Sequence, residues 1–211
     1  RNTSSNNYET LWMGKNKGKP KILPTRNWTP NSEENRIEGI RSKYDPKRIN
    51  KDITILFVGE SAPSEDKFFY LRNTILYYAT FIAFHKIYGG KESGFLEYFQ
   101  KLGCFLYDLL PCGKKWSSKS KSKIASREEK EQARIKFREF IKERKPKMVV
   151  IVMKMLSKVV ENEIRKISIN IAVRNCLEFP NRSKPFCRFI DRLVNILTEA
   201  IELGILPESV C

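Results

Sequence analysis

Apolar and polar positions divide the chain into short continuous apolar runs and longer stretches with helical periodicity. Three runs are nearly uninterrupted and rich in β-branched or aromatic residues, which is typical of strands covered on both faces of a sheet. They span residues 53–58, 104–107 and 148–153. In a fourth segment, residues 167–173, isoleucine or valine occupies every second position, and this pattern predicts one more strand.

Helical patterns separate these runs and follow the last of them. Helices are expected over residues 73–88, 94–102, 126–145, 155–164 and 186–201. Ser126 and Glu129 have the spacing of a capping box at the start of the third helix. Because strands alternate with helices, the sequence predicts an α/β fold, a three-layer α/β/α sandwich with a four-stranded parallel sheet and right-handed crossovers.

The first 51 residues do not share this pattern. They contain scattered prolines, the isolated tryptophans Trp12 and Trp28, and several lysines, without sustained periodicity. We therefore expect an irregular basic N-terminal arm over residues 1–51 and one folded domain over residues 52–211.

Charge narrows the classes of partner. The 211 residues include 40 Lys and Arg against 24 Asp and Glu, which gives a net charge of +16. Such an excess attracts polyanions, so nucleic acid is the first partner to consider and an anionic membrane surface the second. No apolar run approaches the ~18 residues of a membrane-spanning helix. Five cysteines without a CxxC pair argue against a zinc ribbon and a secreted disulfide framework, and the opening residues lack an apolar signal core. An intracellular location, in the cytoplasm, nucleoid or nucleus, is expected.

The loops after the predicted strands are the candidate sites, because ligands of such sheets bind outside the carboxyl ends of the strands. The first loop is Gly-Glu-Ser-Ala-Pro at 59–63, followed by the adjacent rings of Phe68, Phe69 and Tyr70. The second loop is Asp-Leu-Leu-Pro-Cys at 108–112, and the last contains Phe-Pro-Asn at 179–181. Each loop also has a structural explanation, as a strand exit, a turn cap or a source of core rings.

Together the three loops resemble the motifs of the uracil-DNA glycosylase superfamily, whose fold is the same sandwich. Residues 59–63 are similar to its first motif, Gly-Glu-Ala-Pro-Gly or Gly-Gln-Asp-Pro-Tyr. Residues 108–112 align with Asn-Val-Val-Lys-Cys of its iron–sulfur branch, with Asp in place of Asn. Residues 179–181 keep the Pro of the His-Pro-Ser motif and lack its His. The resemblance covers residues 52–204.

This resemblance implies a monofunctional DNA glycosylase of base excision repair. Such an enzyme hydrolyses the N-glycosidic bond of a damaged or deaminated base, uracil or a related one, after flipping it out of DNA. The partner would be double- or single-stranded DNA, with no membrane involved, and we expect a monomer. A catalytically weakened nucleic-acid-binding protein on the same fold is the alternative, which the Asp at 108 and the Phe at 179 favour. A nucleotide-binding α/β enzyme is disfavoured, because no GxGxxG or P-loop motif follows any strand.

The resemblance also implies roles for individual residues. Glu60 would orient the attacking water and stabilise the cationic sugar, and Asn181 would replace the missing His as a donor to the leaving base. The residues expected to bind the base are Ser61, Phe68, Phe69, Tyr70 and Phe179. The residues expected to contact DNA are Arg182, Ser183, Lys184 and Arg188 near the third motif, and Lys114, Lys115 and Trp116 in the lysine-rich loop 113–125.

Asp108 is the most informative departure from the family pattern. An Asn amide both donates and accepts, as the uracil edge requires, whereas an ionised Asp only accepts. Asp108 therefore implies a base with amino or N–H donors, a protonated carboxyl, a role in activating water, or loss of activity. As a structural residue it would cap the next turn.

No metal and no cofactor are expected. Cys112 matches a cluster-ligand position of the iron–sulfur branch, but the N-terminal CxxC of that branch is absent. The single histidine, His85, lies inside a predicted helix and is expected to be a packing or surface residue.

Overall fold

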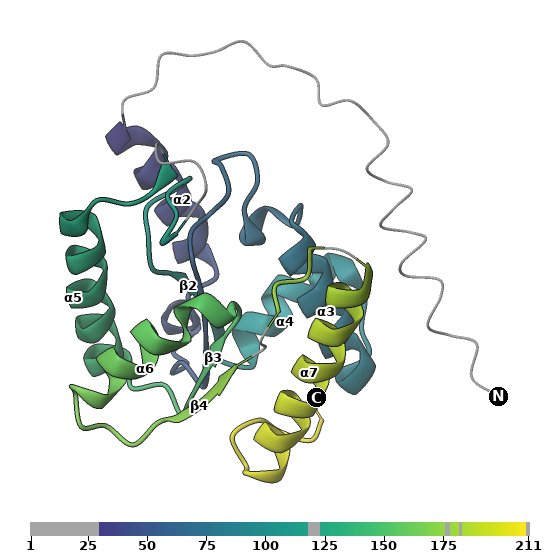
Figure 1. Cartoon of the computed structure of the whole chain (residues 1–211). Coiled ribbons are helices and arrows are strands. Elements are labelled where there is room, and N and C mark those ends of the chain that lie inside the picture. Colours follow the sequence, from purple (N-terminus) through teal and green to yellow (C-terminus); the bar gives the residue numbers. More distant parts are fainter. Residues whose placement is uncertain (1–29, 118–122, 176–177, 182, 210–211) are drawn as a thin grey trace.

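The computed structural model describes residues 30–117, 123–175, 178–181 and 183–209. It has a parallel four-stranded sheet with helices on both faces, so the predicted three-layer α/β/α sandwich is confirmed (Figure 1). No helix among the described residues is both long and apolar enough to cross a membrane.

The sheet has the strand order β2-β1-β3-β4. Its strands are β1 (Ile55–Gly59), β2 (Cys104–Asp108), β3 (Met148–Ile151) and β4 (Ala172–Asn175). Every residue of β1 and β3 is buried, which explains why these runs are continuously apolar rather than alternating. The register places Gly59 opposite Asp108 and Val58 opposite Ile151, so the ends of three strands lie side by side.

Helices α3 (Ile75–Tyr88), α4 (Phe95–Lys101) and α7 (Ser183–Glu202) cover one face, and α5 (Arg127–Arg144) and α6 (Ser157–Arg165) cover the other. The ring of Phe57 lies 5.3 Å from that of Phe99 in α4, on the first face. On the second face the ring of Tyr107 lies 4.6 Å from that of Phe140 in α5. Short 3-10 helices occupy Pro46–Ile49, Phe69–Leu71, Glu92–Gly94 and Lys154–Leu156.

Two local predictions have different outcomes. The capping box is confirmed, because the Ser126 hydroxyl accepts from the Glu129 N–H at 3.1 Å and the Glu129 carboxylate accepts from the Ser126 N–H at 2.7 Å. The fourth strand begins at Ala172 rather than Ile167. Residues 166–168 instead form a turn after α6, in which the Ile167 N–H donates to the Ile164 carbonyl oxygen. Of the alternating residues, Ile167 therefore belongs to the turn after α6, and Val173 belongs to β4.

The prediction of an irregular N-terminal arm is wrong for residues 30–49, which are largely helical. Helix α2 (Pro30–Lys43) and the 3-10 helix Pro46–Ile49 fill most of this segment. Sequence periodicity missed α2 because few of its residues are apolar, with Ile37 buried and Ile40 half-buried. Residues 1–29, including Trp12 and Trp28, lie outside the described residues.

The end of α2 and the segment that follows it cover the outer edge of β2. The Tyr44 ring stacks on the Tyr70 ring at 5.4 Å. The Tyr70 hydroxyl accepts from the Leu106 N–H at 2.7 Å and donates to the Leu106 carbonyl oxygen at 3.3 Å. Because an exposed edge strand leaves such groups unpaired, Tyr70 closes the edge that β2 would otherwise present to solvent.

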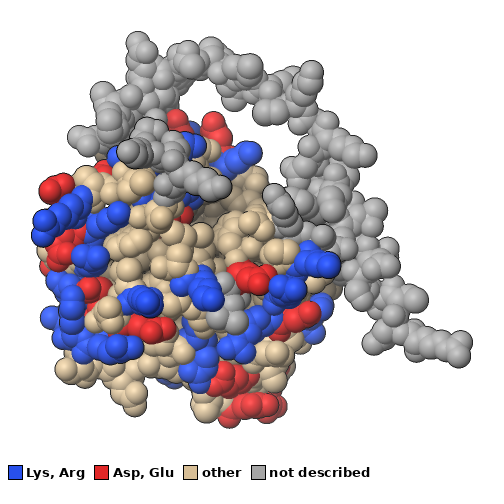
Figure 2. Space-filling view, viewed as in Figure 1, with Lys and Arg blue, Asp and Glu red and all other residues tan. Residues whose placement is uncertain are grey.

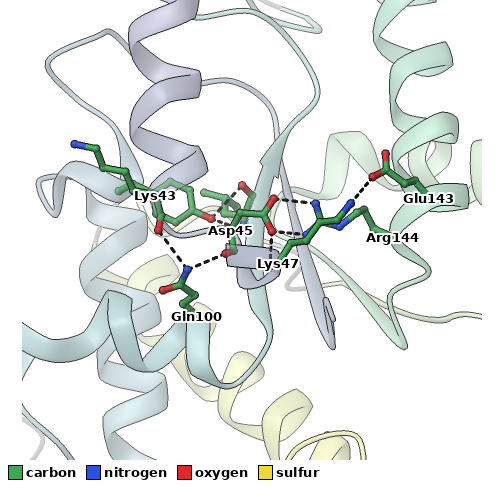
Figure 3. A network of polar contacts seen from close by, with 8 residues as sticks. Lys43, Asp45, Lys47, Gln100, Glu143 and Arg144 are labelled. Carbon is green, nitrogen blue, oxygen red and sulfur yellow. Dashed lines mark hydrogen bonds and ion pairs between the residues drawn. The ribbon is translucent and has the colours of Figure 1, made fainter. Parts of the chain in front are cut away.

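Asp45 ties this N-terminal segment to helices on both faces of the sheet (Figure 3). Its carboxylate accepts hydrogen bonds from both terminal guanidinium nitrogens of Arg144 in α5 and from the Lys47 N–H at 2.9 Å. The Gln100 amide of α4 donates to the Asp45 carbonyl oxygen at 2.8 Å and to that of Lys43 at 3.3 Å. The helical segment 30–49 is therefore an integral part of the fold.

Replacing Asp45 by Asn is expected to lower stability and to weaken its dependence on acid. Partial burial alone would raise the pKa of Asp45, but the hydrogen bonds from Arg144 and Lys47 outweigh it and hold the pKa below its ordinary value. The stabilisation is therefore complete above about pH 4 and is lost as pH falls through the lowered pKa. Urea unfolding should show a loss of ~1–2 kcal/mol at pH 7 that shrinks toward pH 3.

The control is Asp191→Asn, whose exposed carboxylate lies 3.6 Å from Lys86 and should contribute little. Equal losses for Asp45→Asn at pH 7 and pH 3 would contradict the assignment.

Candidate active site

A cavity of about 160 Å³ lies at the carboxyl ends of β1, β2 and β3. Its walls come from the segments that follow these strands, from the start of α3 and from the loop before α7. The lining residues are Gly59, Glu60, Ser61, Ala62, Pro63, Phe68, Phe69, Thr74, Leu76, Leu106, Asp108, Lys115, Val152, Met153 and Phe179. In the order β2-β1-β3-β4 the chain continues from β1 to one side of the sheet and from β3 to the other, and ligands of such sheets bind in the crevice at this switch point. We call it the strand-end cavity.

The segments after β1 and β2 are joined along their length. Backbone N–H groups of residues 109, 110 and 113 donate to the carbonyl oxygens of residues 59, 60 and 62 at 2.8–3.1 Å. The Ser61 hydroxyl donates to the Lys114 carbonyl oxygen at 2.7 Å. The two loops singled out in the sequence thus form one unit, and Ser61 helps to hold it together.

Glu60 is a buried carboxylate beside the cavity. Its side chain is 3% exposed. One carboxylate oxygen of Glu60 accepts a hydrogen bond from the Trp116 backbone N–H at 2.7 Å, and the other lies 3.0 Å from the Lys115 ammonium nitrogen. The Lys115 side chain is 35% exposed and also lines the cavity. The ammonium compensates the buried negative charge, which makes burial of Glu60 tolerable.

Asp108 is the second buried carboxylate, with a side chain 6% exposed. Its Oδ2 lies 2.9 Å from Nη2 of Arg41, which comes from α2. Burial raises the pKa of the Asp108 carboxyl, and the Arg41 guanidinium opposes that rise. Arg41 also pairs with Glu38 at 2.7 Å and lies over the Phe68 ring at 5.4 Å.

Sequence reasoning missed Arg41. It lies 67 positions before Asp108, in a helix that the apolar pattern did not reveal. No local motif marks it, so only the packing of α2 against the end of β2 identifies it.

The two oxygens of Asp108 have different surroundings. A Cβ atom at Gly59 would lie 2.5 Å from Oδ1, so glycine is required where β1 ends. Among the described residues Oδ1 has no hydrogen-bond partner, and the only fully buried side-chain nitrogen or oxygen without one is Nε of Arg41.

The position of Gly59 shows which way Oδ1 faces. Gly59 lines the strand-end cavity, whereas Arg41 lines a separate groove of about 660 Å³ between α2 and α5. Asp108 lines both. Its Oδ2 is thus held by Arg41 from the groove side, and its Oδ1 lies beside Gly59 of the cavity wall.

Aromatic rings form much of the remaining wall. Phe68 and Phe69, both buried, and Phe179, half-buried, line the cavity. Tyr70 does not line it, because its ring and hydroxyl are committed to Tyr44 and to the edge of β2. The structure therefore brings together Glu60, Ser61, Phe68, Phe69, Asp108, Lys115 and Phe179 of the predicted site residues.

Asn181, Lys184 and Arg188, near the third motif, lie outside the cavity lining. Asn181 is exposed, and its N–H donates to the Phe179 carbonyl oxygen at 2.8 Å. Lys184 is exposed, and Arg188 pairs with Glu178 at 3.1 Å. Arg182 lies outside the described residues, and Ser183 is the first residue of α7.

Two residues of the lysine-rich loop contact α5. Lys114 lies 3.1 Å from a Glu129 carboxylate oxygen. The Trp116 ring lies 5.3 Å from the Arg134 guanidinium carbon and 5.7 Å from the Lys130 ammonium nitrogen. Trp116 thus packs against cations of its own chain, an arrangement typical of cation–π contacts.

The remaining polar candidates lie away from the cavity lining. His85 is in the last turn of α3, with Nδ1 2.9 Å from the Gly90 carbonyl oxygen. Cys104 is buried, and burial raises the pKa of its thiol. Within the described ranges, no three His, Cys, Asp or Glu side chains are grouped to hold a metal ion.

No family model and no curated protein matches the sequence. Any function must therefore be inferred from the residues and their arrangement. The arrangement offers two buried carboxylates, an ammonium group and three phenylalanine rings around a space of single-ring size.

Replacing Gly59 by Ala should destabilise the site through Asp108. The added methyl group would meet Oδ1, and the rearrangement should cost ~1–3 kcal/mol in urea unfolding. In an Asp108→Ala background the obstructing oxygen is absent, so the same change should cost much less. Gly94→Ala, where nothing lies within 4 Å of the new Cβ, is the control. Equal costs of Gly59→Ala in both backgrounds would contradict the proposed contact.

Proposed function

We propose that this protein is a DNA glycosylase that hydrolyses the N-glycosidic bond of a damaged or deaminated base flipped out of DNA. The observation that carries the proposal is the meeting of Glu60, Asp108 and Phe68 in one cavity at the carboxyl ends of the strands. These residues come from the two loops that resemble glycosylase motifs, and the chain folds so that both face the same space.

The cavity suits a planar ring. A cavity of ~150 Å³ with apolar walls accepts a benzene-sized molecule, and the strand-end cavity is of this size. Phe68, Phe69 and Phe179 offer apolar aromatic surface to a base that has left the DNA stack.

Glu60 has the position needed for the chemical step. Leaving-group departure makes the sugar cationic, and a fixed carboxylate stabilises that charge and orients the water that attacks it. The two hydrogen bonds to Glu60 fix its carboxylate in one orientation beside the cavity. Lys115 adds a donor at the same place.

Charge supports DNA as the partner. The net charge of +16 favours binding to a polyanion, independent of sequence. Figure 2 shows lysine and arginine side chains spread over the visible face, with acidic side chains among them. Within this proposal the protein acts as a monomer, inside the cell, without a metal or cofactor.

One observation favours a binding protein without catalysis. Asn181, the expected donor to the leaving base, is exposed and does not line the cavity. If no other donor takes its place, the cavity would hold a flipped base without releasing it.

Replacing Glu60 by Gln should separate these two functions. Gln keeps an oxygen for the Trp116 N–H but loses the charge, so base release should fall by about 100-fold or more while DNA affinity changes little. The measurement is base release from oligonucleotides containing uracil, hypoxanthine, xanthine or 5-substituted pyrimidines.

A matched control is Glu163→Gln. Glu163 is also 3% exposed and pairs with Arg138 and with Lys166 at 2.8 Å, but it lies in α6, outside the cavity lining. This control should lose stability and keep activity. Equal loss of activity in both variants would refute the role of Glu60, and no release of any base by the wild type would favour the binding protein.

DNA affinity should fall steeply with salt. Neutralising several phosphates releases counterions, so log affinity against log salt should have a slope steeper than about −3. Lys184→Ala, beside the loop that supplies Phe179, should reduce the slope by about 1. Lys101 is the last residue of α4 and lies just before the start of β2, at the other end of that strand from the cavity. Lys101→Ala should therefore leave the slope unchanged. A slope near zero would remove the support that charge gives to the proposal.

A further inference from the structure

We propose that the strand-end cavity selects a pyrimidine that carries an amino group, cytosine or a 5-substituted cytosine, over uracil and thymine. Oδ1 of Asp108 would accept a hydrogen bond from the amino group. The inference rests on the proposed function only in taking the ligand to be a base flipped out of DNA.

Hydrogen-bond polarity leads to this choice. An ionised carboxylate accepts hydrogen bonds and cannot donate one. The amino group of cytosine donates, whereas at the same ring position uracil and thymine have a carbonyl oxygen, which would face the carboxylate without a donor between them. The amide expected at this position in the resembling family serves uracil because it can donate to that carbonyl.

Arg41 orients Asp108, and its positive charge favours the ionised, accepting form against the rise in pKa that burial gives the carboxyl. Its guanidinium lies 2.9 Å from Oδ2, on the groove side, and leaves Oδ1 on the cavity side. Arg41 does not line the strand-end cavity, so it is not placed to donate to a uracil carbonyl there. We therefore regard Arg41 as a positioning residue for Asp108.

Neither Glu60 nor Ser61 supplies the missing donor at Asp108, and the hydroxyl oxygen of Thr74, the N-cap of α3, accepts from the Tyr77 N–H at 3.1 Å. Both oxygens of Glu60 already accept hydrogen bonds, and the Ser61 hydroxyl already donates to Lys114. The Lys115 ammonium has three protons and uses one on Glu60, so it can also donate to the carbonyl that cytosine and uracil share. Lys115 therefore does not discriminate between them, and Asp108 does.

The size of the cavity favours a pyrimidine over the larger purine. About 160 Å³ matches the space that a single six-membered ring needs. Adenine also carries an amino group, so comparison of adenine with cytosine tests size, and comparison of uracil with cytosine tests polarity.

The test measures binding and release separately. Single-stranded oligonucleotides remove the cost of breaking a base pair, which differs between bases. Each contains one 2′-fluoroarabino nucleotide bearing cytosine, 5-methylcytosine, uracil, thymine or adenine, because the fluorine slows bond cleavage and permits equilibrium titration. The same sequences without fluorine are then assayed for base release.

The wild type should bind the cytosine and 5-methylcytosine oligonucleotides at least about tenfold more tightly than the uracil and thymine ones, and adenine should bind no better than uracil. Asp108→Asn, which is nearly isosteric, should reverse the order toward uracil. Asp45→Asn removes a carboxylate that also pairs with an arginine but lies outside the cavity, and it should leave the order unchanged.

Each outcome bears on one of the two proposals. Tighter binding of uracil, or equal binding of all bases, by the wild type would overturn the inference, and release of any base would still support a glycosylase. Tighter binding of adenine than of cytosine would also overturn it. A preference for cytosine that Asp108→Asn reverses, without release of any base, would support the inference and count against hydrolysis.

Discussion

The ion pair between Arg41 and Asp108 joins the parts of this molecule that matter for its candidate site. Both side chains are largely withdrawn from water, so each charge depends on the other for compensation. The pair fixes the end of β2, orients one oxygen of Asp108 toward Gly59 and holds α2 against the sheet. If either partner were removed, the other would remain as a buried charge, and the wall of the cavity would lose its defined polarity.

Helix α2 and the residues near its end contribute to the fold in two ways. The edge strand β2 needs a cover, and the Tyr70 hydroxyl and the end of α2 provide it. The end of that strand needs a positive charge, and Arg41 of the same helix provides it. A segment that is rich in charge of both signs and poorly amphipathic is thus retained in the fold through an aromatic stack and ion pairs rather than through a broad apolar face.

Segments far apart in the sequence meet at the strand-end cavity, and this supports the glycosylase proposal. The loops after β1 and β2 are joined through backbone hydrogen bonds, and Phe179 completes the wall from the loop before α7. Asp108 and Phe179, the two departures from the family pattern, both line this cavity. Asp108 is a paired acceptor rather than an amide, and the proposed preference for an amino-bearing base rests on this difference.

Local pattern determined the sandwich, the capping box at Ser126 and the candidate loops, because strand and helix periodicity report how each segment is buried by itself. The same pattern misplaced β4, whose extent is limited by the four residues of β3 that pair with it. Only the tertiary structure decided that Tyr70 closes an edge while Phe68 lines the cavity, and that Arg41 meets Asp108. Such contacts depend on the relative placement of segments far apart in the chain and on the shared cost of burying charge, and neither leaves a local periodic signal.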